Sequence, residues 1–187
     1  GNLAGSRWDG SNWTGYWGVT PANAVYDGSR VGESVAVSEV GDFLSAGGPG
    51  YQSDRGLAYL SGPGLSLQIV AGDNSETGRF AQSVDLSRDG NILLVGEPKN
   101  DDTGTDAGSI KFFSPNGSGT YTLTQEIASP TADGGEFGSS VAISRDGQTA
   151  VIGAPQADRV YVYEYDGSTW SLSQTLPGSA GTQWGAS

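Results

Sequence analysis

The sequence contains one hairpin-forming pattern three times, and this repetition constrains the fold more than any other feature. In each copy a run of small and β-branched residues is followed by a turn and by a second apolar run that closes with glycine, any residue and proline. The first residue of the pattern and the closing glycine are 16 residues apart in every copy, at 31 and 47, 80 and 96, and 137 and 153. Identical spacing at three places predicts a repeat protein.

The third copy shows most clearly why the pattern predicts a β-hairpin. Residues 137–144 (FGSSVAIS) form the first run, residues 145–148 (RDGQ) the turn, and residues 150–155 (AVIGAP) the second run. Asp-Gly is a typical hairpin turn, and the proline cannot donate a ladder hydrogen bond, so the second strand ends there. We therefore expect two antiparallel strands in each copy.

A second hairpin follows the first in every copy, over residues 57–70, 109–127 and 160–176. Four short strands per repeat, with no helical period, are typical of β-propeller blades, whose apolar faces are buried when blades stack. The predicted fold class is all-β, with β-propeller blades built as four-stranded antiparallel meanders: three complete repeats plus one split or partial blade. The expected units are an amino-terminal completing segment (1–30), blade 1 (31–79), blade 2 (80–136), blade 3 (137–183) and the start of the next blade (184–187).

Both ends of the chain carry pieces of the pattern. Residues 184–187 (WGAS) restart it, residues 6–10 (SRWDG) are similar to the hairpin turn at 144–147 (SRDG), and residues 18–21 (GVTP) are a stretched form of the closing triplet. Three interpretations stay open: the ends close a four-bladed ring within one molecule, the tail of one copy completes the head of the next and builds a filament, or the chain is a fragment of a longer array. The absence of Met likewise leads us to expect a mature or internal segment.

The motifs of the third copy resemble the FG-GAP repeat of the integrin α-subunit head propellers. Phe137-Gly138 and Gly153-Ala154-Pro155 match in full, while the second copy has Ala81 and Glu97 and the first has Val31 and Gly48. The resemblance implies a propeller used for protein or glycan contact, usually without catalysis. The calcium loops of that family, of the Asp-x-Asp-x-Asp-Gly type, are absent from the hairpin turns here, so no calcium site is carried over to them.

The composition excludes several classes of function. Without Cys or His, the chain has no disulfide, no zinc thiolate site, no thiol nucleophile and no histidine base. A formal net charge of -12 would repel nucleic acid, and no apolar run is long enough for a membrane span. A pair of glycosidase carboxylates is not marked out among the 21 acidic residues, since chance alone brings such pairs together. We therefore expect no catalysis, no cofactor, no nucleic acid partner and no membrane insertion.

One candidate metal site lies in the segment that joins the second and third strands of blade 2. Asp101, Asp102 and Asp106 place three carboxylates within six residues, and with backbone carbonyls they could bind calcium. The other interpretation is a solvated turn. A weaker acidic cluster, residues 73–76 (DNSE), has the same two interpretations.

Aromatic residues near the ends are the candidate interface. Trp8, Trp13, Tyr16 and Trp17 lie within ten residues, and Trp184 opens the tail. They either anchor a partner or a sugar, or fill the space between blades and subunits.

Two Asn-x-Ser/Thr sequons, at Asn12 and Asn116, are candidate glycosylation sites in a eukaryotic secreted protein. Together with acidity and the absence of Cys, they favour an extracellular or cell-surface location.

These observations predict a non-catalytic, extracellular, structural or adhesive propeller protein that assembles head to tail with further copies of itself. The alternative is a ligand- or glycan-binding propeller module of a larger secreted or cell-surface protein. Glycans and other extracellular proteins are the further partners that we expect.

Overall fold

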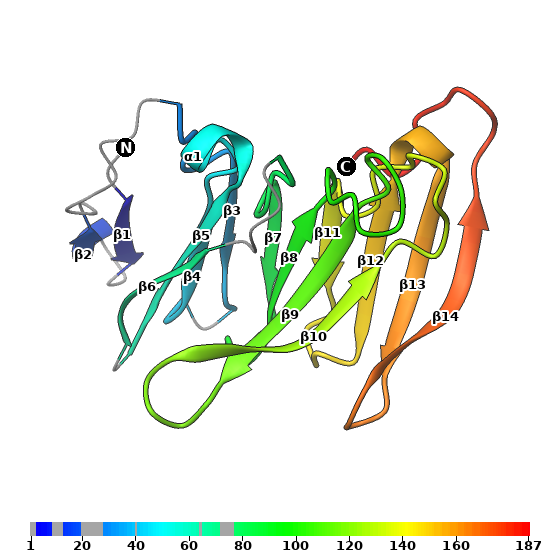
Figure 1. The fold of residues 1–187 in the computed structure, drawn as a ribbon. Helices are drawn as coiled ribbons and strands as arrows, with labels where there is room; N and C mark the ends of the chain where they lie inside the picture. The colour runs from blue at the N-terminus through cyan, green and yellow to red at the C-terminus, as the bar shows by residue number, and fades with distance from the viewer. Residues whose placement is uncertain (1–2, 9–12, 20–27, 40, 64, 72–76) are drawn as a thin grey trace.

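The protein is described by a computed structural model, in which residues 3–8, 13–19, 28–39, 41–63, 65–71 and 77–187 are placed. In these ranges the chain forms three four-stranded antiparallel sheets and one two-stranded sheet, arranged in a row (Figure 1). Each four-stranded sheet is a meander in which consecutive strands are neighbours. The predicted all-β fold of propeller blades is confirmed.

The three meanders are blades 1, 2 and 3 in chain order. Their strands fall within the predicted repeat boundaries. Blade 1 consists of β3 (Ser34–Val37), β4 (Leu44–Gly47), β5 (Leu57–Gly62) and β6 (Leu65–Ala71); blade 2 of β7 (Ser83–Leu86), β8 (Leu93–Glu97), β9 (Ser109–Pro115) and β10 (Tyr121–Ala128); blade 3 of β11 (Ser140–Ile143), β12 (Thr149–Ala154), β13 (Arg159–Tyr165) and β14 (Trp170–Pro177).

Two short helical turns interrupt the strands, although we expected no helix. Both follow a second strand: α1 (Tyr51–Asp54) in blade 1 and the 3-10 turn η1 (Pro155–Ala157) in blade 3. Gln52 and Ser53 have positive φ values, 47° and 61°, so α1 is a tight loop and not a regular helix. One turn of this kind has no hydrophobic period by which sequence reasoning could find it.

The blades stack through their first and second strands. β7 contacts β3 and β4 of blade 1, and β11 contacts β7 and β8 of blade 2. Two apolar clusters fill the space between neighbouring blades, and the aromatic opening residues Phe80 and Phe137 are fully buried in them. The core of the molecule is therefore the set of surfaces between blades, as repeat stacking requires.

The spacing of the closing glycine has a steric reason. A Cβ atom on Gly96 would lie 2.0 Å from the carbonyl oxygen of Gly138, which belongs to the opening of the next blade. Gly138 itself has a φ of +93°, which favours glycine at the second position of the opening. The fixed spacing thus comes from a backbone contact between neighbouring blades that leaves no room for a side chain.

The amino-terminal sheet is a hairpin of β1 (Leu3–Trp8) and β2 (Trp13–Val19). Its register matches that of β13 and β14: Trp8 pairs with Trp13 as Tyr165 pairs with Trp170, and a bulge follows after three pairs in both hairpins. The hairpin is therefore the outer pair of strands of a blade. The register places residues 6–8 in β1 and residues 18–19 in β2, where we expected an inner hairpin turn and a closing triplet; residues 9–10 and 20–21 lie outside the described residues.

The hairpin and β14 lie at opposite ends of the row of sheets (Figure 1). Within the described ranges, β1–β2 and β14 are therefore not adjacent, as a four-bladed ring would require. In the described ranges, no helix is long and apolar enough to span a membrane.

Candidate interaction site

The carboxyl-terminal tail docks on blade 3 in the way that each blade opening docks on the preceding blade. Between blades 2 and 3, the Ser83 hydroxyl donates a hydrogen bond of 2.8 Å to the Gly138 carbonyl oxygen. At the tail, the Ser140 hydroxyl donates to the Gly185 carbonyl oxygen at 2.9 Å, and a Cβ on Gly153 would lie 1.9 Å from that oxygen. The tail therefore occupies the position of a fourth blade opening.

Asp158 holds the loop that leads into this tail. Its carboxylate accepts hydrogen bonds from the Gly181 N–H at 2.6 Å and from the Trp184 N–H at 3.3 Å. These backbone hydrogen bonds, that of Gly181 first, lower the pKa of Asp158. The docked tail is thus stabilised by the ionised carboxylate.

The surface of blade 3 that faces away from blade 2 has the composition of an inter-blade surface, but none of the described residues forms a blade that covers it. We call it the open face; it comprises Val151, Val160, Val162, Gln174 and Leu176. The register places these residues at the positions of Leu94, Ile110, Phe112, Gln125 and Ile127 in blade 2, which face blade 3.

Burial differs sharply between the two surfaces. Val151 is 39% exposed and Leu176 41%, whereas Leu94 is completely buried. Trp184, the opening residue of the tail, is 50% exposed, whereas its equivalents Phe80 and Phe137 are 0% exposed. The open face is therefore an apolar surface of the kind that marks a protein contact site.

Gln125 forms a second polar link between blades 2 and 3. Its amide nitrogen donates to the Trp170 carbonyl oxygen at 2.9 Å, and its amide oxygen accepts from the Trp170 N–H at 2.8 Å. One side chain thereby satisfies both backbone groups of the first residue of β14. We call this contact the glutamine clamp; sequence reasoning missed it, although a Gln recurs at the same position of all three repeats, at residues 68, 125 and 174.

A cleft of about 330 Å³ lies beside the glutamine clamp, between blades 2 and 3. Two aromatic residues, Tyr165 and Trp170, contribute to its lining. The Trp170 ring is stacked on Phe112 with centroids 4.3 Å apart, and Tyr165 lies 5.2 Å from it at a tilt of 31°. Since these rings pack on one another and Trp170 is buried, the cleft does not present Trp170 as a platform for a sugar.

A buried ion pair is the feature of blade 2 that sequence reasoning missed most clearly. The Lys111 ammonium contacts the Glu97 carboxylate, and both side chains are almost completely buried; Glu126 lies 3.1 Å from the same ammonium. Burial alone would lower the pKa of Lys111, but the charge of Glu97 and the hydrogen bonds to both carboxylates raise it above its usual value. Lys111 therefore stays charged.

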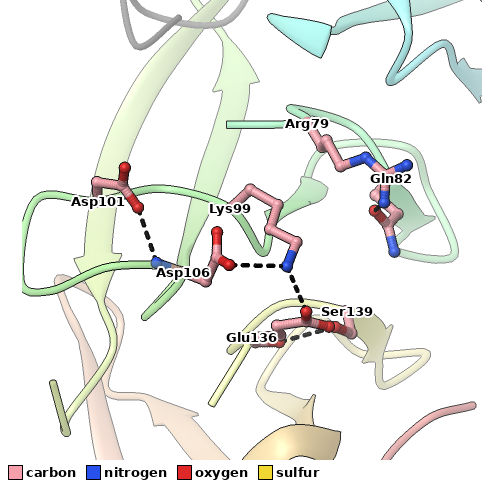
Figure 2. A network of polar contacts seen from close by, with 7 residues as sticks. All are labelled: Arg79, Gln82, Lys99, Asp101, Asp106, Glu136 and Ser139. Atoms are coloured by element: carbon pink, nitrogen blue, oxygen red, sulfur yellow. Dashed lines mark hydrogen bonds and ion pairs between the residues drawn. The ribbon is translucent and has the colours of Figure 1, made fainter. Parts of the chain in front are cut away.

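The predicted calcium segment forms a polar network instead of a cluster of carboxylates (Figure 2). The Lys99 ammonium donates to Asp106 at 3.0 Å and to Glu136 at 2.5 Å, which joins blade 2 to the opening of blade 3. Asp101 accepts from the Asp106 N–H at 2.7 Å, and the Asp102 N–H donates to Asn100 at 3.0 Å.

In this network the predicted calcium ligand Asp106 is paired with Lys99. Across the described ranges, no three acidic residues are grouped so that they could hold a metal ion. Calcium binding by Asp101, Asp102 and Asp106 stays a prediction, and it would have to displace Lys99 from Asp106.

The remaining predicted residues are placed only in part. Asn116 is exposed in the turn between β9 and β10, where its amide oxygen accepts hydrogen bonds from Ser118, so the sequon is accessible. Asn12 and residues 73–76 lie outside the described residues. For the interface aromatics Trp8, Trp13, Tyr16 and Trp17, the structure describes the backbone of β1 and β2 only.

Comparisons with known proteins agree with this geometry. The family model of the FG-GAP repeat matches residues 66–111 and 125–168. No curated protein sequence matches the chain. The chain carries FG-GAP repeats, which are typical of extracellular proteins.

Several solved structures are similar in fold. Hydrazine synthase of Kuenenia stuttgartiensis is 14% identical with a TM-score of 0.54, and the match covers 77% of this chain and 49% of that one. For Saccharomyces cerevisiae Sqt1 the values are 12%, 0.55, 79% and 36%. For the WD40 domain of Toxoplasma gondii coronin they are 11%, 0.54, 78% and 35%. The chain spans less than half the length of these structures, and the likeness concerns the propeller fold alone.

Proposed function

We propose that this chain is a non-catalytic extracellular propeller module that acts through protein contacts and assembles head to tail with further copies of itself. The observation that carries the proposal is the open face: apolar residues at the positions of a buried inter-blade surface, beside a tail that is already docked as the next opening. Such a surface gains free energy when another blade covers it, at roughly 25 cal/mol for each Å² of apolar area removed from water.

Composition supports the non-catalytic and extracellular parts of the proposal. The absence of His and Cys removes the commonest bases and nucleophiles. The FG-GAP repeat and the absence of Cys fit a secreted contact protein.

The test is the size of the purified chain in solution, measured by multi-angle light scattering over a wide range of protein concentration. We expect the wild-type chain to associate as concentration rises, and a Val151→Asp/Leu176→Asp variant to stay monomeric. Leu172→Asp is the matched control: Leu172 is 45% exposed on the same strand as Leu176, but the register directs it, with Tyr163, toward blade 2.

Circular dichroism checks that each variant is folded. A wild-type chain that stays monomeric at the highest concentration, or a control variant that disrupts association as strongly as the open-face variant, overturns the self-assembly.

In the second candidate function, this chain is a ligand-binding module of a larger propeller, and the remaining blades of that propeller cover the open face. This candidate is favoured because the chain matches only 49% or less of the length of each similar structure. In that case the chain alone is a monomer, and it binds an added FG-GAP polypeptide through the same open face.

A further inference from the structure

We propose that the open face of blade 3 is covered by the β1–β2 hairpin of a second copy, and that Gln174 holds this hairpin by the backbone of Trp13. The inference rests on the proposed head-to-tail assembly and names the contact that makes it. Its first support is that the docked tail and the hairpin correspond to different parts of one blade. The tail supplies a docked opening at Gly185, and the hairpin supplies a third and a fourth strand.

The hairpin has the shape that an outer pair of strands needs at this position. In β1–β2 the bulge residue is Tyr16, between the pairs of Gly15 and Trp17; in β13–β14 it is Ser173, between the pairs of Leu172 and Gln174. The turn sequences also agree, because residues 9–13 read DGSNW and residues 166–170 read DGSTW. Trp13 therefore occupies the register position of Trp170, the residue that the glutamine clamp holds.

Blade 3 offers a second clamp at the corresponding position. Gln174 pairs with Val162 as Gln125 pairs with Phe112, and Gln68 pairs with Leu60 in the same way in blade 1. A Gln thus stands at this register in all three blades. Gln125 is partly buried against Trp170, whereas the Gln174 side chain is exposed on the open face.

The position of the hairpin in the molecule points to a second copy as its source. β1–β2 lies beyond blade 1, at the far end of the row from β14, so it does not reach the open face of its own chain (Figure 1). A second copy presents the same hairpin at the end of its own row. Docking it on the open face would repeat the contact that Gln125 of blade 2 makes with Trp170 of blade 3.

The first experiment measures the association constant of the full chain by analytical ultracentrifugation. Gln174→Ala removes both clamp hydrogen bonds, and we expect the association constant to fall roughly ten- to a hundredfold. Gln174→Glu keeps the acceptor but places a negative charge against the Trp13 carbonyl oxygen, so it should be at least as damaging. Gln148→Ala, at another exposed Gln of blade 3, is the matched control and should leave the constant unchanged.

The second experiment locates the contact by cross-linking, for which a chain without Cys is well suited. Leu176→Cys, on the open face, and Gly15→Cys, at the register position of Leu172, are made in separate chains, mixed, and treated with a short bismaleimide. A covalent dimer that needs both variants supports the inference, and Leu176→Cys mixed with Asn116→Cys is the control that should give none.

The outcomes separate the inference from the proposed function on which it rests. Association that is lost in Val151→Asp/Leu176→Asp but is unchanged in Gln174→Ala, with no cross-link between positions 176 and 15, overturns the hairpin contact and leaves head-to-tail assembly in place. A monomeric wild-type chain overturns both. If the wild-type chain associates, raising the salt concentration should strengthen the association. Salt screens the repulsion between two copies that each carry a net charge of -12.

Discussion

Blades 2 and 3 share one backbone plan but differ in the middle of the surface that each turns toward the preceding blade. In blade 2 this place holds the buried charges Glu97 and Lys111. In blade 3 the equivalent positions are Ala154 and Tyr161, both buried. The middle of this surface accommodates an ion pair in blade 2 and an aromatic residue in blade 3. The shared backbone arrangement of the two blades therefore does not depend on these side chains.

The backbone contacts of the openings are what the two blades have in common. Gly96 and Gly153 each face a carbonyl oxygen of the following opening, at Gly138 and Gly185. The difference lies in what covers this contact: a complete blade at Gly138 and a short tail at Gly185. The comparison thus separates the contact between a closing glycine and the next opening from the burial of that contact by a complete blade. The predictions below test these two contributions.

The largest effect is expected from the aromatic opening residues. Phe137→Ala removes a fully buried ring that packs on Tyr161 and Tyr163, and it should lower the free energy of unfolding by about 4 kcal/mol. Trp184→Ala, at the half-exposed equivalent, should cost less than about 1 kcal/mol. Urea unfolding of both variants measures this, and equal losses would contradict the assignment of a partly covered face.

The buried ion pair gives the next largest effect. Lys111→Met removes the ammonium counter-ion of a buried carboxylate and should cost about 3 kcal/mol. The double variant Glu97→Ala/Lys111→Tyr copies blade 3 and should recover most of that loss. If urea unfolding finds the double variant less stable than Lys111→Met, blade 3 is not a valid template for blade 2.

The two closing glycines should respond unequally to one added methyl group. In Gly96→Ala the new Cβ collides with Gly138 in a complete inter-blade contact, and we expect a loss of about 2 kcal/mol. In Gly153→Ala the tail can move away, so the global free energy of unfolding should hardly change. Hydrogen exchange should then be faster over residues 178–187 in Gly153→Ala, and an unchanged tail would argue against docking.

The smallest effect is local and depends on pH. Because docking lowers the pKa of Asp158, the carboxylate stabilises the docked tail above the ordinary pKa of Asp, about 3.9, and this contribution is lost as the pH falls through the lowered pKa. NMR shifts of the Gly181 and Trp184 amides should change in that range. Asp158→Asn should show the undocked shifts at neutral pH; docked shifts in this variant would refute the role of the charge.

Local sequence patterns were sufficient to predict the fold. The contacts that could not be predicted are those between residues far apart in the sequence. The Asp-Gly turns and the fixed spacing of Gly47, Gly96 and Gly153 predict hairpins and their repetition, because turn chemistry acts over a few residues. The Glu97–Lys111 pair and the contact of Gln125 with Trp170 depend on which residues face each other after folding. Residues 6–8 lie in β1 although SRWDG resembles an inner turn in sequence, and only the strand register reveals this.

The docked opening at Gly185 also has a consequence for how the chain acquires its structure. The openings at Gly138 and Gly185 are each held by the blade before them, through one hydroxyl and one glycine, and at Gly185 this contact forms without the strands of a following blade. As the polypeptide leaves the ribosome, a finished blade can therefore capture the first residues of its successor and set their direction. Acquisition of structure would proceed in step with translation, one meander at a time, with no search for distant pairing partners.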